Sequence, residues 1–304
     1  MTKQEPPKKT IETEFKRYVL NKSCILNLLE PEKVLKTGFK EIDENCPIIL
    51  GENSIITGRT GMGKTVLGAN IVNGILQNSD NTKVLVLSLE LKHKAFIQRL
   101  LSCESNIEGW KIRKGFKDNN NTTFTSEKEN FINVAKKYID KFKDRILIVD
   151  DINSIEFIEK LLADLQKNFH FKPDYILIDY ANILTTKNLT DLNKHVQIST
   201  WIKFLAKKNN IHVQAICQAN RATKENTDAY ARTENLADSD QYGRDAFTVY
   251  SIKTSKEDDK YFINPTKNRN GKPEEEIEYK WNPKSGKIIN NNSEPATIED
   301  FNEF

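Results

Sequence analysis

Short apolar runs alternate with helically spaced apolar residues along the chain from Thr37 onward. The runs predict buried β-strands, and apolar residues three or four positions apart predict amphipathic helices. The predicted strands are 54–57, 84–89, 146–149, 175–178 and 211–217, and the predicted helices are 66–75, 94–103, 126–142, 154–168 and 192–208. Apolar strands separated by helices are typical of a mostly parallel, twisted sheet with helices on both faces. We therefore expect an α/β fold.

Beyond residue 245 the pattern changes. Four apolar segments, 247–252, 261–264, 277–281 and 287–289, follow one another without helices between them. Strands joined by short connections pair with their chain neighbours, so we expect the sheet to end in C-terminal antiparallel strands. Residues 105–125 and 221–243 are long and polar, which predicts loops.

The same pattern divides the chain into three parts. Residues 1–35 form an N-terminal arm in which 10–29 carry an apolar stripe at helical spacing, and residues 36–290 form the α/β domain. Residues 291–304 are polar and acidic, which predicts a flexible tail. The helix of the arm has to bury its stripe on its own core or on a neighbouring subunit.

Composition restricts the classes of protein that fit. The chain has 304 residues, 38% of them hydrophobic, and a net charge of +3, so any surface for nucleic acid has to be local. The four cysteines lack C-x-x-C spacing, which favours reduced thiols in a cytoplasmic compartment over disulfides or a zinc site. We expect no membrane association, because no apolar run has the length of a membrane span or a signal peptide.

The clearest chemical signal is a complete G-x-x-x-x-G-K-T phosphate-binding loop between a predicted strand and a predicted helix. It consists of Gly58, Arg59, Thr60, Gly61, Met62, Gly63, Lys64 and Thr65. The glycines allow backbone N–H groups to turn toward phosphate oxygens, and the helix N-terminus adds the positive end of its dipole. We expect Lys64 to reach the terminal phosphates and the Thr65 hydroxyl to bind Mg²⁺. The chain is therefore predicted to bind a nucleoside triphosphate such as ATP.

An acidic partner for Mg²⁺ is expected at the end of a neighbouring strand. Asp179 follows the run 175–178, whereas Asp150 and Asp151 follow the run 146–149. We favour Asp179, because its strand lies nearer along the chain to strand 211–217, where a phosphate sensor is expected. Either acid can also be a solvated strand cap.

Four further side chains suit hydrolysis. Glu90 follows strand 84–89, where a carboxylate can activate water or merely stabilise the next helix N-terminus. Gln218 ends strand 211–217, and its amide can bind the γ-phosphate or simply close the strand. Lys267 and Arg269 flank Asn268 and can reach a phosphate together, although such pairs are also common on solvated faces.

Taken in order, these segments resemble the ATPase domain of DnaB-type replicative helicases, within the RecA-like P-loop family. The resemblance extends over about residues 37–289. It comprises T-G-F-K-E-I-D (37–43), the loop 58–65, S-L-E (88–90), D-D (150–151), L-I-D-Y (177–180), Q-A-N-R (218–221) and K-N-R-N-G (267–271). The ordered set is far more specific than any one segment.

The resemblance implies an ATP-dependent DNA helicase or translocase that acts in replication as a homo-oligomer. It implies a hexameric ring with ATP sites between subunits, single-stranded DNA as ligand, and a primase or loader protein as partner. Glu90 is implied as the catalytic base, Lys64 and Gln218 as ligands of the γ-phosphate, and Lys267 and Arg269 as fingers that act in trans. The implied location is the cytoplasm of a bacterium or of a phage-infected cell.

Two features depart from the family pattern. The sequence shows neither the N-terminal helical domain nor the primase that accompanies such ATPase domains. In the segment that corresponds to L-R-E-S-G, Ala237 replaces the arginine and Asp240 adds negative charge, which weakens contact with DNA phosphates. The remaining candidate DNA contacts are Lys187, Arg221, Lys224, Arg232 and Arg244.

These departures leave two alternatives open. One is a recombination ATPase of the RecA or RadA type. The other is an ATP-switched loader or interaction subunit that does not unwind DNA, because resemblance in fold does not guarantee the same function.

Overall fold

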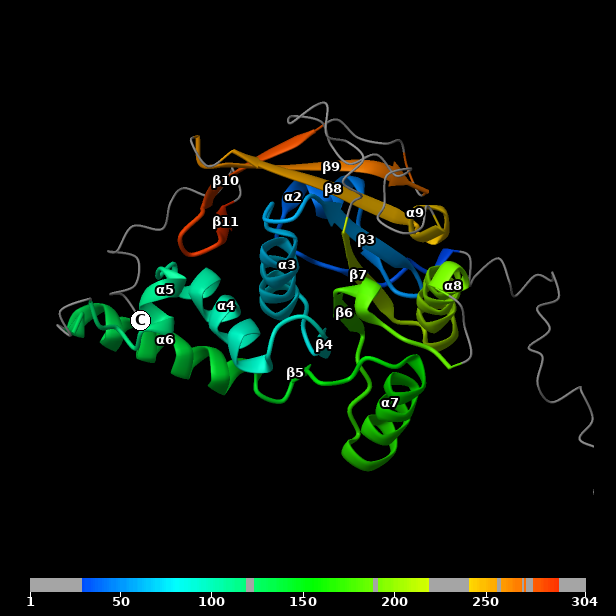
Figure 1. Ribbon diagram of the computed structural model, residues 1–304, viewed down its shortest axis with the longest axis horizontal. Helices are drawn as coiled ribbons and strands as arrows, with labels where there is room; N and C mark the ends of the chain where they lie inside the picture. Colours follow the sequence, from blue (N-terminus) through cyan, green and yellow to red (C-terminus); the bar gives the residue numbers. More distant parts are fainter. Residues whose placement is uncertain are drawn as a thin grey trace, which may run out of the picture. The chain divides into compact units, whose positions relative to one another are not determined.

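The computed structural model describes residues 29–118, 123–187, 191–218, 241–255, 258–269, 271 and 276–289, without the side chains of 191–193. The predicted tail, and all but the last residue of the helix predicted at 10–29, lie outside this range. Residues 1–33 and 34–304 are separate compact units. The sheet and its helices all belong to the second unit (Figure 1).

Strands and helices alternate through most of the second unit. The strands are β1 (Val34–Leu35), β2 (Ile48–Ile49), β3 (Asn53–Gly58), β4 (Val84–Ser88), β5 (Ile146–Val149), β6 (Tyr175–Asp179), β7 (His212–Gln218), β8 (Thr248–Ser255), β9 (Lys260–Asn268), β10 (Ile277–Asn282) and β11 (Lys287–Ile289). The helices are α2 (Lys40–Asn45), α3 (Lys64–Asn78), α4 (His93–Ser105), α5 (Gly109–Arg113), α6 (Thr125–Phe142), α7 (Ile155–Phe169), the 3₁₀ turn η2 (Ala181–Ile183), α8 (Asp191–Asn209) and α9 (Gln241–Asp245).

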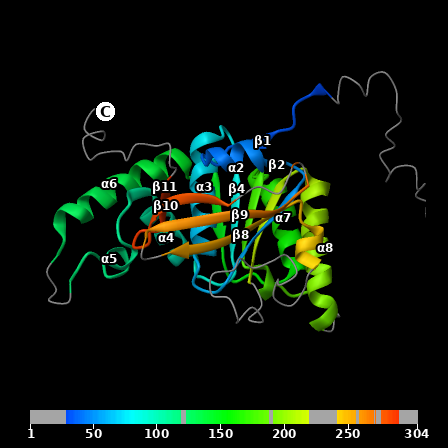
Figure 2. The same ribbon diagram turned by 90° about the horizontal axis from the view of Figure 1, so that it is seen from above.

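One large mixed sheet organises these elements. In the described part of the chain it has nine strands in the order β11-β10-β9-β8-β3-β7-β6-β4-β5. All pairs from β8 to β5 are parallel, and β8–β9, β9–β10 and β10–β11 are antiparallel. Figure 2 shows β8, β9 and β10 side by side. The predicted change to antiparallel pairing near the C-terminal end of the chain is therefore confirmed.

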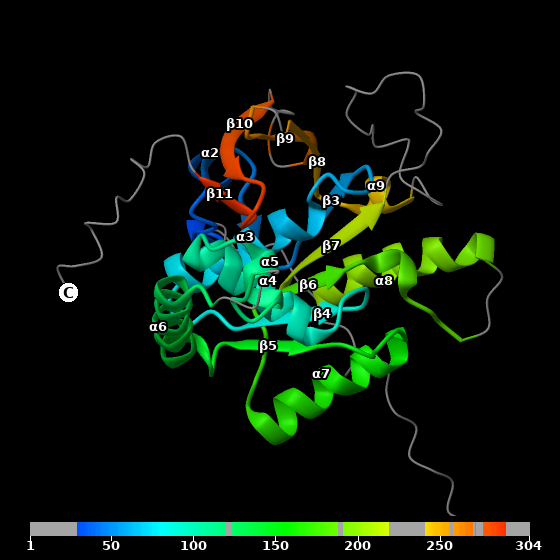
Figure 3. The ribbon, with the colours of Figure 1, turned by 60° about the vertical axis from the view of Figure 1, so that its left-hand side comes forward.

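Helices cover both faces of the sheet (Figure 3). Alternate residues of a strand point to opposite faces, so Val84 and Val86 pack with α3, α4 and α6, while Leu85 and Leu87 pack with α7, α8 and α9. Both faces of the parallel part are thus apolar, which explains why its strands read as continuous apolar runs.

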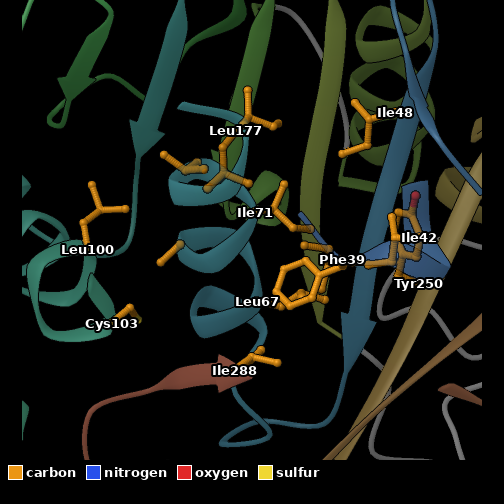
Figure 4. Packing of buried hydrophobic residues seen from close by; sticks show 14 of the residues in the cluster. Phe39, Ile42, Ile48, Leu67, Ile71, Leu100, Cys103, Leu177, Tyr250 and Ile288 are labelled. Carbon is orange, nitrogen blue, oxygen red and sulfur yellow. The ribbon is translucent and has the colours of Figure 1, made fainter. Parts of the chain in front are cut away.

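The helix after the phosphate-binding loop lies at the centre of one of these cores. Leu67 and Ile71 of α3 are fully buried among residues from β6, α4, β11 and the segment before β3 (Figure 4). Burial of each such side chain stabilises the fold by roughly 1.5–3 kcal/mol. The position of α3, and of the loop at its N-terminus, is therefore set by tight packing on several sides.

The T-G-F-K-E-I-D segment has a structural role in this packing. The Asp43 carboxylate accepts hydrogen bonds from the Thr37 hydroxyl at 2.7 Å and from the Thr37 backbone N–H at 2.8 Å. The turn lies so close to α3 that a Cβ on Gly74 would come within 1.7 Å of the Thr37 carbonyl oxygen. The motif therefore closes a turn that docks on α3.

Two loop predictions were wrong in part. Residues 105–125 contain α5 and the small cluster of Ile107, Ile112 and Phe116, because a helix of five residues is too short to show periodicity among polar neighbours. The predicted loop 221–243 overlaps α9, which begins at Gln241, and its residues 221–240 lie outside the described residues.

Candidate functional site

The phosphate-binding loop connects the end of β3 to the start of α3. Gly63 is the N-cap of α3 and has a φ of 85°, a left-handed conformation that glycine adopts without strain. The Lys64 ammonium donates to the carbonyl oxygens of Gly58 at 2.9 Å and Arg59 at 3.0 Å. Burial lowers the pKa of Lys64, while the nearby carboxylates of Glu90 and Asp179 act in the opposite direction.

Strand pairing brings the other candidate residues to the same edge of the sheet. Gly58 pairs with Gln218 across β3 and β7, and Ser88 pairs with Asp179 across β4 and β6. Because these strands are parallel, their carboxyl ends meet at the edge where the phosphate-binding loop lies. The structure therefore brings together Lys64, Thr65, Glu90, Asp179 and Gln218.

Asp179 is a fully buried carboxylate beside Thr65. The Thr65 hydroxyl donates to Asp179 Oδ1 at 3.3 Å, and Asp179 Oδ2 has no hydrogen-bond partner among the described residues. Burial raises the pKa of Asp179 to about 6, although the Thr65 hydrogen bond and the Arg99 charge lower it. A hydroxyl and a buried, incompletely paired carboxylate are hard oxygen donors that suit Mg²⁺.

The competing acids face other groups. Asp150 Oδ2 accepts hydrogen bonds from the backbone N–H of His93 at 2.7 Å and pairs with His93 Nδ1 at 2.8 Å. These contacts lower the pKa of Asp150. Asp151 is exposed. Asp179 is thus the acid that lies against the phosphate-binding loop.

Glu90 follows β4 and Gln218 ends β7, the two strands that flank the strand of Asp179, and β7 lies between that strand and β3. Glu90 is exposed, and its backbone N–H donates to the Asp179 carbonyl oxygen at 3.1 Å. The Gln218 side-chain amide donates to the Thr60 hydroxyl at 2.5 Å, and its backbone N–H donates to Asn182 Oδ1 at 3.4 Å. Gln218 therefore joins the loop to the segment after β6.

Lys267 and Arg269 lie together but apart from this cluster. The Lys267 ammonium donates to the carbonyl oxygens of Gly243 at 2.7 Å and Arg244 at 2.8 Å, and Arg269 donates to the same Arg244 oxygen at 2.7 Å. Burial, together with the Arg269 charge, lowers the pKa of Lys267 to about 8. The Arg269 guanidinium lies 5.2 Å from the centre of the Phe247 ring.

The strand registers show how these cations are separated from the loop. Val249 on β8 pairs with Ile55 of β3 on one side and with Lys267 of β9 on the other. Lys267 is therefore level with Ile55, three residues before Gly58 ends β3. The pair lies toward the amino end of β3, away from the loop of its own chain.

The candidate DNA contacts are only partly described. Lys187 is exposed, and its backbone N–H donates to Glu156 Oε1 at 3.1 Å. Arg244 is an exposed residue of α9. Arg221, Lys224, Arg232, Ala237 and Asp240 lie outside the described residues.

Two residues near the site escaped the sequence analysis. The positive charge of Arg99 on α4 lowers the pKa of the Asp179 carboxyl. In the sequence, the only indication of this role is a cation on the helix face that also carries the buried residues Phe96 and Cys103. Tyr261 donates its hydroxyl to the Gly63 carbonyl oxygen at 3.1 Å. Nothing in the sequence indicated this contact, because the two residues are 198 positions apart.

Cys46, Cys103 and Cys217 are buried and form no disulfide bond among the described residues, and Cys24 lies outside the described residues. The described part of the chain holds no group of three or more His, Cys, Asp or Glu side chains that could bind a metal ion. Of its helices, none has the length and apolarity needed to cross a bilayer.

Sequence comparison places relatives of this chain among replicative helicases. The family model for the DnaB-like helicase C terminal domain matches residues 34–290. The replicative DNA helicase DnaB of Leifsonia xyli is 27% identical over 216 residues, and that of Mycoplasma pneumoniae is 27% identical over 241 residues. These alignments cover 70% and 75% of this chain but 45% and 48% of those proteins, so the chain spans about half the length of the curated relatives it matches.

Solved structures share the fold. A solved ATPase domain has a TM-score of 0.73 at 21% identity, and the match covers 88% of this chain and 95% of that one. A DnaB-like replicative helicase, described with its interactions with primase, has a TM-score of 0.73 at 20% identity, covering 88% of this chain and 66% of that one. The predicted RecA-like architecture, with a mostly parallel sheet and antiparallel C-terminal strands, is confirmed.

Proposed function

Because the chain belongs to the DnaB-like helicase C-terminal domain family, we propose that it uses ATP to move along and unwind DNA during replication. The observation that carries this proposal is the meeting of Lys64, Thr65 and Asp179 at one edge of the sheet, with the Thr65 hydroxyl 3.3 Å from the Asp179 carboxylate. A loop that cradles phosphates next to a buried carboxylate is the arrangement that phosphoryl transfer requires.

The loop 58–65 would bind the ATP phosphates through its backbone N–H groups and Lys64. Thr65 and Asp179 would hold Mg²⁺, Thr65 through its hydroxyl and Asp179 through bound water, and both fit that ion because they offer oxygen donors at one place. When bound, the ion neutralises charge on the phosphate oxygens. The orphaned Asp179 Oδ2 supports this assignment, since a buried polar atom normally has a partner.

Glu90 would act as the base that orients and deprotonates the attacking water. Its place directly after β4, with its backbone N–H 3.1 Å from the Asp179 carbonyl oxygen, supports this role, because a base has to lie within hydrogen-bond reach of the reacting water. Gln218 would contact the γ-phosphate and report its loss through Asn182, to which its backbone is bonded. Lys64 would stabilise the charge that develops on the transferred phosphoryl group.

Lys267 and Arg269 would act on the ATP of a neighbouring subunit. The register of β9 supports this, because it puts Lys267 level with Ile55 rather than with the loop of its own chain. A cation supplied in trans stabilises the transition state and typically contributes a factor of about 10³–10⁵ to the hydrolysis rate. The chain would therefore work as a homo-oligomeric ring, a hexamer, with ATP between subunits.

Single-stranded DNA would pass through the ring, and the exposed cations Lys187 and Arg244 are the candidates for phosphate contact among the described residues. Arg221, Lys224 and Arg232 remain candidates for the same role. A primase or a loader protein would be the protein partner, and the work would take place in the cytoplasm.

Unwinding of a forked DNA duplex in the presence of ATP and Mg²⁺ tests this function. We expect strand separation by the 304-residue chain, loss of activity to background in Lys64→Ala, and full activity in Lys208→Ala, which removes an exposed lysine of α8. ATP hydrolysis without strand separation would contradict the helicase assignment and favour a loader. Absence of hydrolysis would contradict the whole proposal.

A further inference from the structure

A buried tyrosine of the antiparallel part of the sheet supports the phosphate-binding loop. Tyr261 on β9 has no exposed surface, and its hydroxyl donates to the Gly63 carbonyl oxygen at 3.1 Å. The same oxygen accepts the backbone N–H of Leu67 at 3.0 Å, which is the first hydrogen bond of α3. Both lone pairs of the Gly63 carbonyl are thus engaged, one by the helix and one by Tyr261.

A second aromatic ring holds Tyr261 in place. Trp281 on β10 packs edge-on against Tyr261 with the ring centres 5.4 Å apart. A Cβ on Gly63 would lie 3.3 Å from the Tyr261 ring and 3.8 Å from the Trp281 ring. Gly63 therefore lies against this aromatic pair, and its left-handed φ of 85° would strain any residue with a Cβ.

Peptide geometry makes this contact relevant to phosphate binding. In a trans peptide unit the C=O and the N–H point in opposite directions, and the bond between Gly63 and Lys64 is not among the cis bonds of the described chain. Fixing the Gly63 oxygen therefore fixes the direction of the Lys64 N–H. That N–H is one of the unpaired donors at the N-terminus of α3, where an anion binds.

We propose that Tyr261 is a positioning residue for nucleotide binding, which orients the Gly63–Lys64 peptide through its hydroxyl while Trp281 fixes its ring. This inference rests on the proposed function, because it takes the loop to be a nucleotide site. Burial raises the pKa of the Tyr261 hydroxyl, so the group stays protonated and continues to donate.

The test compares two buried tyrosines that differ in where their hydroxyls point. Tyr261→Phe removes the bond to Gly63 and leaves the ring in place. Tyr250→Phe is the matched control: Tyr250 on β8 is 1% exposed, and its hydroxyl donates to the Cys46 carbonyl oxygen at 2.7 Å, away from the loop. Both variants lose one buried bond from a hydroxyl to a backbone carbonyl, so their losses of thermal stability should be similar.

The affinity for a fluorescent ADP analogue with Mg²⁺ should separate them. We expect Tyr261→Phe to bind about 3- to 10-fold more weakly and Tyr250→Phe to bind within about twofold of the unmodified chain, as loss of one neutral hydrogen bond predicts. For ATP hydrolysis, KM should rise by the same factor while kcat stays nearly constant, since the peptide contacts the phosphates before and during the reaction.

Trp281 offers an independent signal. In a Trp110→Phe, Trp201→Phe background it is the remaining tryptophan of the chain, and its fluorescence should change when nucleotide binds the adjacent loop. If Tyr261→Phe and Tyr250→Phe bind nucleotide equally well, or if Trp281 does not respond, the positioning role is wrong while the nucleotide site stands. If the unmodified chain binds no nucleotide, the proposed function fails, and the positioning role fails with it.

Discussion

At the scale of single residues, His212 on β7 is a buried polar group away from the site with a partner at each ring nitrogen. A chain of buried hydrogen bonds runs from the Tyr175 hydroxyl to Gln214, from Gln214 to the Ser54 hydroxyl at 3.0 Å, and from Ser54 to His212 Nε2 at 2.8 Å. At the end of this series of hydrogen bonds, His212 Nδ1 is bonded to the Ile49 carbonyl oxygen at 2.8 Å. Every bond is satisfied when His212 is neutral, with its proton on Nδ1. A second proton on Nε2 would displace the Ser54 hydroxyl hydrogen from its acceptor.

This network predicts a pH-dependent loss of stability. Burial lowers the pKa of His212 from 6.5 to about 4, so between these values the unfolded chain binds more protons at this position than the folded one. The free energy of unfolding should therefore fall as the pH drops from 6.5 to 4, by about 3 kcal/mol from this group. We expect the stability advantage of the unmodified chain over His212→Gln, measured by urea denaturation, to shrink by that amount between pH 7 and pH 4. Parallel pH curves for the two proteins would show that His212 does not titrate in this way.

At the scale of elements, the β10–β11 hairpin is attached to the helix that carries the phosphate-binding loop. Asn70 of α3 donates to the Gly286 carbonyl oxygen at 2.8 Å and accepts the Ile288 backbone N–H at 3.1 Å. The Ser102 hydroxyl of α4 donates to the Ser285 carbonyl oxygen at 2.9 Å. The hairpin thus relies on two helices for the pairing of its buried backbone groups, and Trp281 of the same hairpin is held beside the loop.

Asn70→Ala should therefore destabilise the protein markedly. It leaves the buried Ile288 N–H without its acceptor and leaves the Gly286 carbonyl oxygen with the weaker Cys103 thiol as donor, at 3.4 Å. We expect a loss of about 2–4 kcal/mol in the free energy of unfolding. Asn70 and Asn78 each donate to the carbonyl oxygen four residues earlier, Val66 and Gly74, at 2.8 Å. Asn78→Ala is therefore a matched control on the same helix, because Asn78 is exposed. Its loss should stay below about 0.5 kcal/mol. Equal losses in urea denaturation would refute the anchoring role of Asn70.

At the scale of the whole molecule, β9 contacts the phosphate-binding loop near one end and carries a cation proposed to act in trans near the other. Tyr261 near its start contacts the loop of the same chain, and Lys267 near its end lies with Arg269 in the position proposed to serve a neighbour. The proposed ring therefore has one strand that touches the phosphate site of its own subunit and carries the cations for the next.

Mixing of two inactive variants tests the arrangement in trans. Lys64→Ala keeps Arg269 but lacks a working loop, and Arg269→Ala keeps the loop but lacks the finger. In equal mixtures about a quarter of independent sites combine an intact loop with a neighbour's arginine, so we expect ATPase activity to rise from background toward that fraction. Arg113→Ala, an exposed arginine of α5, should leave the unmixed chain fully active. A mixture as inactive as its components would refute catalysis in trans.

Local patterns predicted the elements because their causes are local. The spacing of apolar residues gave strand β5 and helix α6 almost to the residue, and glycine and lysine at fixed offsets identified the loop at 58–65. The spacing of apolar residues did not predict α5, whose five residues are shorter than two helical turns. It also ended β9 too early, before Pro265, whereas the strand continues through Lys267 with an irregularity in its register. Proline lacks the N–H that a regular ladder requires, so the sequence favoured an end there.

What the sequence determined by itself is the loop, the strands of the nine-stranded sheet and the order of the candidate residues, since each depends on neighbours within a few positions. The sequence did not predict β1 and β2, because strands of two residues are too short to show a pattern. Only the tertiary structure decided which acid lies beside Thr65, that Lys267 lies away from its own loop, and that Tyr261 supports Gly63. The first and last of these contacts join residues 114 and 198 positions apart, and strand order and register bring them together. Apolar runs alone do not encode that order, because every strand of a buried parallel sheet has the same pattern and can take any place in it.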